Sequence, residues 1–383
     1  MKKTKPLIFI LAGEPSGDLL GARIMAALKE ETNGDIAFAG VGGEKMESEG
    51  INSFFPIEDI ALMGIFELLP HLRRLYRRIN ETVEAIRKLE PDILLTIDSP
   101  GFVIAVLKRL RGSSFPKIHY VAPSIWAWRP KRVNKFLGRI DHLLCLLPFE
   151  PQLFEEKGLS ASFVGHPVLE RRFTDRKGDT FRARFGIGPS DMVLGVFPGS
   201  REGELRRHIP IFLETATRLG EKYSNLKVVI PTLPSLYSSI VDACKKYRIS
   251  ATIISKEQDR WEAMMACNFG LAASGTVALE LVEARVPSVI GYHANFLTEL
   301  VARIFVKVRF VNLCNILADE EIIPERIMSK CRSEILCEEL VELVSSKEAA
   351  KLQIQRAKQQ LKKLQPGCGV PSQHAAKTLL GYL

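Results

Sequence analysis

The sequence lacks the cysteine spacing of a disulfide framework or a zinc site. Its seven cysteines are odd in number and scattered, and no two form a Cys-x-x-Cys pair. They are Cys145, Cys244, Cys267, Cys314, Cys331, Cys337 and Cys368. This distribution argues against both kinds of site and favours a reducing compartment.

Long apolar runs are also missing. No stretch approaches the roughly twenty apolar residues that a membrane-spanning helix needs. Lys2, Lys3 and Lys5 precede an apolar run like the start of a signal peptide, but this run is short and soon meets Glu14 and Asp18. We therefore predict a first strand at 7–12 and a chain that is soluble or peripheral to a membrane.

Acidic residues are absent between Asp98 and Asp141. Nine basic residues fall there, as many as the net charge of +9: Lys108, Arg109, Arg111, Lys117, Arg129, Lys131, Arg132, Lys135 and Arg139. Such a surface attracts nucleic acid, anionic lipid or a phosphorylated substrate. Because no nucleic-acid recognition motif accompanies it, we expect no nucleic-acid partner.

An apolar segment followed by a basic helix shifts this choice towards lipid. Residues 61–69, which include Met63 and Phe66, lead into a helix that carries Arg73, Arg74, Arg77 and Arg78. Apolar side chains before a basic amphipathic helix are typical of binding at a membrane interface. A core helix with a solvated basic face explains the same pattern, and the sequence leaves both interpretations open.

The order of strands and helices predicts an α/β fold. Apolar strands are expected at 7–12, 36–40, 92–97, 117–121, 142–146 and 161–164, and again at 193–197, 227–231, 251–254, 269–273 and 288–292. Strands that alternate with helices form parallel sheets covered on both faces. We therefore expect two Rossmann-like doubly wound domains facing across a cleft, over 1–170 and 171–346. The helices of 347–383 are expected to pack on the first domain or on a partner subunit.

Two glycine turns lie between a strand and a helix in the second half. One is Pro198-Gly199-Ser200-Arg201 and the other is Ser274-Gly275-Thr276, with Glu280 one turn further along its helix. A helix N-terminus carries unpaired N–H groups and partial positive charge, so such turns bind anions. Serine and threonine that simply cap a helix give the same pattern, and this explanation suffices for either turn alone. Two such turns, with an arginine and a glutamate, favour a nucleoside diphosphate site.

The first turn, Gly13 to Asp18, has a different character. It lacks the Gly-x-Gly-x-x-Gly spacing, and Glu14 and Asp18 would repel a pyrophosphate. Because carboxylates accept hydrogen bonds from hydroxyls, we expect this turn to line a sugar site. Ligands bind beyond the carboxyl ends of strands in such sheets, which also places Asp98 at a site.

Several motifs together resemble those of lipid-A-disaccharide synthases. They occur in the family's order along nearly the whole chain: Gly13-Glu14-Pro15-Ser16-Gly17-Asp18, Asp98-Ser99-Pro100-Gly101-Phe102, Pro123-Ser124-Ile125-Trp126-Ala127-Trp128, Val164-Gly165-His166-Pro167, Pro198-Gly199-Ser200-Arg201 with Glu204, and Ser274-Gly275-Thr276 with Glu280. The resemblance implies an inverting GT-B glycosyltransferase of the Gram-negative envelope. It would join UDP-2,3-diacylglucosamine to 2,3-diacylglucosamine 1-phosphate and release UDP.

The residue patterns and the resemblance together predict roles for individual residues. Asp98 is expected to be the catalytic base, although a cap for the following helix is the alternative. Glu14 and Arg201 are expected to act in catalysis with it. The nucleotide residues would be Ser200, Arg201, Ser274, Gly275, Thr276, Glu280 and Asn315. The substrate or membrane residues would be Ser16, Asp18, Met63, Phe66, Arg73, Arg74, Arg77, Arg78, Trp126 and Trp128.

We expect no cofactor and no metal, because the sequence has no Asp-x-Asp pair to clamp a pyrophosphate through a divalent ion. The expected partners are the two diacylated substrates and an anionic membrane surface at the cytoplasmic side of the inner membrane, and a homodimer is left open. His166 is expected to be structural and His208 to lie on a helix surface. A UDP-sugar epimerase or hydrolase on the same scaffold is the alternative function.

Overall fold

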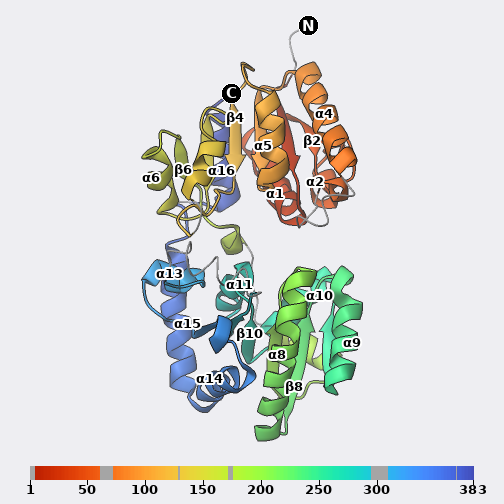
Figure 1. Cartoon of the computed structure of the whole chain (residues 1–383), viewed down its shortest axis with the longest axis vertical. Coiled ribbons are helices and arrows are strands. Elements are labelled where there is room, and N and C mark those ends of the chain that lie inside the picture. The colour runs from red at the N-terminus through yellow and green to blue at the C-terminus, as the bar shows by residue number, and fades with distance from the viewer. Residues whose placement is uncertain (1–4, 61–71, 128–129, 171–175, 295–308, 368) are drawn as a thin grey trace. The chain divides into compact units, whose positions relative to one another are not determined.

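The chain folds into two α/β units. The computed structural model describes residues 5–60, 72–127, 130–170, 176–294, 309–367 and 369–383. The first unit comprises Met1–Glu170 and Leu364–Leu383, and the second comprises Arg171–Lys363 (Figure 1). Each unit is built around one parallel six-stranded sheet.

The sheet of the first unit has the order β2-β1-β3-β4-β5-β6. Its strands are β1 (Leu7–Ala12), β2 (Ala37–Val41), β3 (Ile93–Ile97), β4 (Lys117–Tyr120), β5 (His142–Cys145) and β6 (Ala161–Phe163). All six were predicted to within about a residue. Their helices are α1 (Pro15–Glu31), α2 (Glu44–Ser48), α4 (Leu72–Leu89), α5 (Pro100–Arg109), α6 (Glu150–Glu155) and α16 (Pro371–Leu380), with short 3₁₀ turns η1 (Ile57–Asp59), η3 (Pro130–Lys135) and η4 (Pro167–Glu170).

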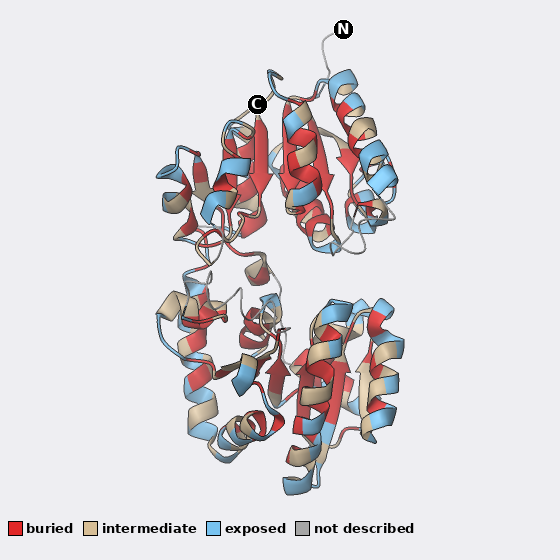
Figure 2. Ribbon diagram, in the orientation of Figure 1, coloured by how far each residue is buried: buried red, intermediate tan, exposed pale blue. Residues whose placement is uncertain are grey.

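Helices bury both faces of this sheet. Successive side chains of a strand point to opposite faces, so each strand contributes to two cores. In β1, Phe9 and Leu11 pack into a core with α4 and α5, whereas Ile8 and Ile10 pack into a core with α1 and α16. Figure 2 shows the strands buried and the helices buried only along one side. This double burial explains why the strands are apolar throughout their length.

The sheet of the second unit has the order β12-β11-β10-β7-β8-β9. Its strands are β7 (Met192–Phe197), β8 (Leu226–Pro231), β9 (Ala251–Ile254), β10 (Phe269–Ala272), β11 (Ser288–Tyr292) and β12 (Glu325–Ile327). The predictions found five of these and missed the three-residue β12. The helices are α7 (Arg176–Arg184), α8 (Glu202–Lys222), α9 (Tyr237–Tyr247), α10 (Glu257–Met265), α11 (Thr276–Glu283), α13 (Leu313–Ala318), α14 (Ser333–Ser345) and α15 (Lys347–Lys362), with 3₁₀ turns η5 (Pro234–Leu236) and η6 (Met328–Lys330).

The last helices are divided between the two units, whereas the sequence suggested one segment over 347–383. In α15, Gln353 accepts a hydrogen bond from the main-chain N–H of Ser288 (2.8 Å) and donates one to its carbonyl (3.1 Å), which attaches α15 to the sheet of the second unit. Helix α16 packs on α1 in the first unit. In the described ranges every helix is too short or too polar to span a membrane.

Candidate functional site

The two glycine turns of the second unit precede α8 and α11. Arg201 is the N-cap of α8 and Gly275 the N-cap of α11, and neither described helix start has a side-chain cap. The Ser274 hydroxyl instead donates to the carbonyl of Val311 at 2.9 Å. Simple capping therefore does not explain these turns. Both helix starts present N–H groups that can receive an anion.

Both turns line one pocket at the carboxyl ends of β7, β8 and β10. Its volume is about 360 Å³, enough for a small ligand. It contains six of the seven residues predicted to bind a nucleotide: Ser200, Arg201, Ser274, Gly275, Thr276 and Glu280. The structure thus brings together residues that lie up to eighty positions apart in the sequence.

Sequence reasoning missed another wall of this pocket. Arg260 and Trp261 reach it from α10, and Thr232 and Leu233 reach it from the loop after β8. Arginine offers a planar cation and tryptophan a flat apolar face, which suit a phosphate and a base. No motif surrounds them. Only their place after a strand of the same sheet could have indicated them.

The turn at Gly199 has a backbone that requires glycine. Its φ is +116°, and a Cβ there would meet the Glu204 carboxylate at 2.7 Å. Glu204 lies 3.6 Å from the Arg201 guanidinium. Because the Arg201 side chain is 56% exposed, this ion pair contributes little to stability, and the guanidinium can turn towards a ligand.

The prediction for Asn315 is not supported. Its side chain is fully buried and bonded within the second unit. The carbonyl oxygen accepts from the N–H groups of Ile322 (2.8 Å) and Ile323 (3.0 Å), and the amide donates to the carbonyl of Ile323 (2.8 Å) and to Glu325 (3.3 Å). Asn315 therefore holds the turn before β12 instead of lining the pocket.

The expectation that His208 lies on a helix surface was wrong. The residue is fully buried on the inner side of α8. Its ring contacts the turn that follows β7 and the residue that follows β11, so position 208 belongs to the side of the helix that faces the sheet. His166 is also buried, and its ring accepts from the N–H of Val168 at 3.2 Å, as expected for a structural residue.

A second, smaller pocket lies in the first unit, beyond the carboxyl ends of β3 and β4. Its volume is about 180 Å³, and Asp98, His119, Val121 and Arg132 line it. Its backbone is strained, with φ of +50° at Asp98, +46° at Ser99 and +79° at Val121. Non-glycine residues in this region cost on the order of 1–3 kcal/mol each, and such strain gathers at functional sites.

Asp98 does not cap the helix after it. The N-cap of α5 is Ser99, which makes no side-chain cap, and one Asp98 carboxylate oxygen accepts from the N–H of Ser99 at 2.8 Å. The main-chain N–H of Asp98 donates to the carbonyl of Tyr120 at 3.0 Å. The Asp98 backbone is thus held by β4, and its carboxylate is held by its own turn, in the wall of the pocket.

His119 faces the same pocket as a neutral ring. It is fully buried, with Nδ1 2.8 Å from the Thr96 hydroxyl. Burial lowers its pKa to about 3. At neutral pH the His119 ring is therefore uncharged.

The residues of the first turn lie in different surroundings. Glu14 is the N-cap residue of α1, and Ser16 is exposed. Neither is among the described residues that line the two pockets above. Asp18 is buried, and its carboxylate accepts from the N–H groups of Gly43 (2.8 Å), Lys45 (3.1 Å) and Met46 (3.0 Å). These bonds fasten the start of α2, which gives Asp18 a structural role.

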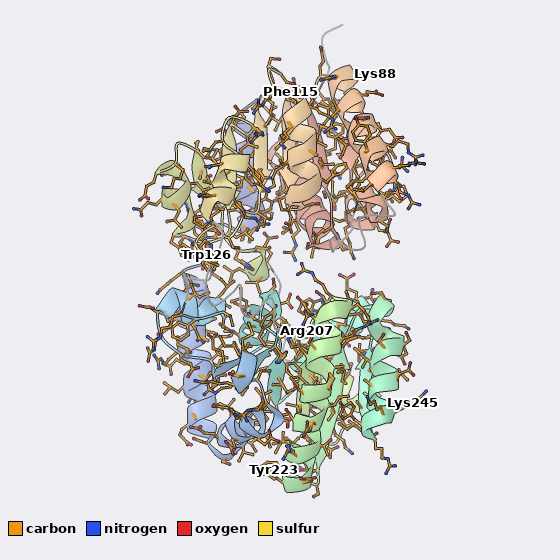
Figure 3. All side chains as sticks on the ribbon, viewed as in Figure 1. Lys88, Phe115, Trp126, Arg207, Tyr223 and Lys245 are labelled. Carbon is orange, nitrogen blue, oxygen red and sulfur yellow. The ribbon has the colours of Figure 1, made fainter. Side chains whose placement is uncertain are left out.

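Trp126 is anchored by a buried carboxylate. Its indole N–H donates to Glu150 at 3.0 Å, and the other Glu150 oxygen accepts from the N–H of Leu147 at 3.1 Å. Figure 3 shows Trp126 and Phe115 towards opposite ends of the first unit, consistent with their places after and before β4. Trp126 follows the segment that lines the Asp98 pocket. Trp128, also predicted here, lies outside the described residues.

Glu150 should make stability depend on pH. Burial raises its pKa to about 7. Between the ordinary carboxyl value and pH 7 the folded protein binds more protons than the unfolded chain, so its free energy of unfolding falls as pH rises, by up to about 1.4 kcal/mol per pH unit. Urea unfolding from pH 5 to 8 should show this trend in wild type relative to Glu150→Gln. Glu156→Gln, exposed beside α6, is the control, and equal trends in wild type and Glu150→Gln would contradict the prediction.

Helix α4 packs on the core through Ile79, Val83 and Ile86 and carries the predicted arginines on its other faces. Arg73, Arg74 and Arg77 are exposed. Arg78 is half-buried and bonded to Asp59 (2.5 Å) and Glu81 (2.6 Å), so it is less available to a lipid phosphate than the other three arginines. Arg74 also approaches Asp59 (3.3 Å), and Arg77 approaches Glu81 (3.5 Å). Met63 and Phe66 lie outside the described residues.

Comparisons with known proteins agree on one family. A model of the lipid-A-disaccharide synthetases matches residues 8–378. The lipid-A-disaccharide synthase of Rhodospirillum centenum is 44% identical over 99% of this chain and 95% of the relative. That of Paramagnetospirillum magneticum is 40% identical over 98% and 97%.

Solved structures share the fold at low identity. UDP-GlcNAc 2-epimerase from Neisseria meningitidis bound to UDP-GlcNAc is 13% identical, with a TM-score of 0.63 and coverage of 98% of both chains. A glycosyltransferase from Rickettsia africae is 11% identical, with a TM-score of 0.61 and coverage of 99% and 98%. These similarities confirm the predicted two-domain GT-B architecture.

Proposed function

The chain belongs to the lipid-A-disaccharide synthetase family of glycosyltransferases in lipid A biosynthesis, and we propose that it joins UDP-2,3-diacylglucosamine to 2,3-diacylglucosamine 1-phosphate. The products are lipid A disaccharide 1-phosphate and UDP. One observation carries the proposal: both uncapped helix starts, Arg201 and Glu280 share one pocket of the second unit.

The donor binds in this pocket through its diphosphate. The main-chain N–H groups at the starts of α8 and α11 meet the phosphate oxygens, and Arg201 adds a cation. Glu280 accepts hydrogen bonds from the ribose hydroxyls. Charge that develops on the departing UDP is stabilised by these dipoles and by Arg201, which need no rearrangement as the bond breaks.

The acceptor is activated in the first unit by Asp98. Its carboxylate removes the proton of the acceptor 6-hydroxyl while that oxygen attacks the anomeric carbon of the donor. The bond from that carbon to the UDP oxygen breaks, and the configuration inverts to a β-1,6 linkage. The strained backbone at Asp98 and Ser99 supports this role, because it holds the carboxylate at a fixed place in the pocket wall.

Release of UDP with and without acceptor tests the proposal against its alternative. The similar folds of UDP-GlcNAc 2-epimerases make an epimerase or hydrolase the natural competitor. Purified protein given only UDP-diacylglucosamine should release almost no UDP, and addition of diacylglucosamine 1-phosphate should start the release. Equal release in both reactions would indicate a hydrolase, and an epimerised nucleotide sugar would indicate an epimerase.

The proposal includes peripheral binding to the anionic inner membrane at its cytoplasmic side. Both substrates carry acyl chains, and extracting these from a bilayer costs about 0.8 kcal/mol per CH₂. The first turns of α4 supply exposed Arg73, Arg74 and Arg77 next to the apolar sequence 61–69. A protein that remains at the interface avoids that cost.

Sedimentation with vesicles should therefore show binding to anionic but hardly to neutral lipid, and high salt should reduce it. Arg73→Ala/Arg77→Ala should weaken binding by about 1 kcal/mol per residue removed, because each cation interacts with the anionic surface. Met63→Ser/Phe66→Ser should weaken it as well.

The matched control is Arg206→Ala/Lys245→Ala, which removes two exposed cations from the second unit. It should sediment like wild type. If the α4 double variant does so too, α4 is only a core helix with a solvated basic face.

Turnover should survive excess EDTA. The sequence has no Asp-x-Asp pair, and Arg201 with two helix starts supplies positive charge for the diphosphate. Dialysed protein assayed with EDTA and with added magnesium should give equal rates. Activity that disappears in EDTA and returns with magnesium would show that the leaving group is stabilised differently.

A further inference from the structure

His208 connects two segments of the second unit through both of its ring nitrogens. Nδ1 lies 2.9 Å from the carbonyl oxygen of Pro198, and Nε2 lies 3.0 Å from the main-chain nitrogen of His293. The N–H of His293 can only donate, so Nε2 accepts and carries no proton. Nδ1 then carries the proton and donates to Pro198, which fixes one neutral tautomer.

The two partners lie on functionally different segments. Pro198 begins the glycine turn that lines the nucleotide pocket, next to Gly199 in its left-handed conformation. His293 directly follows β11. Arg207, labelled in Figure 3 and adjacent to His208, donates to the carbonyl of His293 at 3.3 Å. Consecutive residues of α8 therefore hold both main-chain groups of His293.

The surroundings keep the ring neutral. His208 is fully buried between the rings of Phe212 (5.7 Å between centroids) and Tyr292 (5.2 Å). Burial lowers its pKa, the Pro198 carbonyl and Glu204 raise it, and Arg207 and His293 lower it. A second ring proton would sit on Nε2 and face the N–H of His293, so that two donors would oppose each other and the hydrogen bond would be lost.

We propose that His208 is a positioning residue of the nucleotide pocket: its Nδ1–H holds the Pro198 carbonyl and so fixes where the N–H groups at the start of α8 meet a diphosphate, while the bond from His293 keeps the ring in the tautomer that donates. This inference rests on the proposed function, because it assumes that the pocket binds UDP. A phenylalanine or leucine could fill the same space. Only a ring with one donor and one acceptor can hold both segments.

Three substitutions separate this role from packing. His208→Asn places a donor near the position of Nδ1 and keeps the bond to Pro198. His208→Gln places an acceptor near the position of Nε2 and keeps only the bond to His293. His208→Phe fills the volume and makes neither bond. Thr215→Val is the matched control, since Thr215 is fully buried on the same helix and its hydroxyl bonds only the carbonyl of Ile211 at 2.8 Å.

Calorimetric titration with UDP, with a thermal melt of each protein, decides the question. We expect the dissociation constant of His208→Asn to lie within about threefold of wild type. His208→Gln and His208→Phe should bind at least about tenfold more weakly although folded at the assay temperature. Thr215→Val should bind UDP like wild type even if its melting temperature falls. Wild-type affinity in folded His208→Gln and His208→Phe would overturn the proposal.

Failure of the proposed function would look different, because wild type itself would not bind UDP. Hydrogen–deuterium exchange then tests, without any ligand, whether His208 holds the Pro198–Arg201 turn. Peptides covering 199–201 should exchange faster in His208→Gln and His208→Phe than in wild type and His208→Asn. Equal exchange in all four proteins would overturn the positioning role.

Discussion

Asp98→Asn should abolish measurable turnover and leave UDP affinity within a few-fold of wild type. An amide cannot remove a proton from the acceptor hydroxyl, and loss of a general base lowers a rate by about 10²–10⁴-fold. Asparagine keeps an oxygen that can accept from the N–H of Ser99, so the turn should remain folded. Steady-state kinetics with both substrates and a UDP titration of the same preparation measure the two effects.

Asp92→Asn is the matched control for Asp98→Asn. Asp92 lies just before the other end of β3, and its carboxylate accepts from the N–H of Leu7 at 2.7 Å. This variant makes the same chemical change away from both pockets and should keep near-normal kcat. Near-normal kcat in Asp98→Asn, or loss of its UDP binding, would remove Asp98 from the role of base.

Arg201→Ala and Glu280→Gln should each weaken UDP binding by about 1–3 kcal/mol. Each loses a hydrogen bond to a charged group, one to the diphosphate and one to the ribose. Isothermal calorimetry with UDP measures both effects. Arg206→Ala is the control on the same helix, because its side chain is 78% exposed and pairs with Glu202. Unchanged affinity in both pocket variants would place the nucleotide elsewhere.

Local sequence patterns were sufficient to predict the sheets. Strands buried on both faces are apolar throughout, and the glycine turns mark where they pass into helices, so eleven strands and the starts of α8 and α11 were predicted. The strand β12 was missed because three residues, Glu325 to Ile327, carry no period. Features that depend only on residues close together in the sequence, such as apolar strands and glycine turns, can therefore be predicted from it.

The partners of polar side chains could not be predicted in this way. The Asp18 carboxylate accepts a hydrogen bond from the start of α2, some twenty-five residues away. The His208 ring accepts one from the N–H of His293, eighty-five residues away. The Asn315 side chain is hydrogen-bonded to the turn before β12. In each case the motif suggested a ligand or a surface, and the tertiary contact decided the outcome. The residues next to the two glycine turns of the second unit do lie together in one pocket, because both turns end at the same edge of one sheet.

Transfer itself is tested most directly by giving the purified protein both substrates, with a radioactive label in the 1-phosphate of the acceptor. The account predicts that the label moves into a single lipid with the mass of the disaccharide monophosphate, with one UDP released for each product formed. The label should remain in the monosaccharide with Asp98→Asn. Label that stays in the monosaccharide with wild type, while UDP or an altered nucleotide sugar accumulates, would contradict the account.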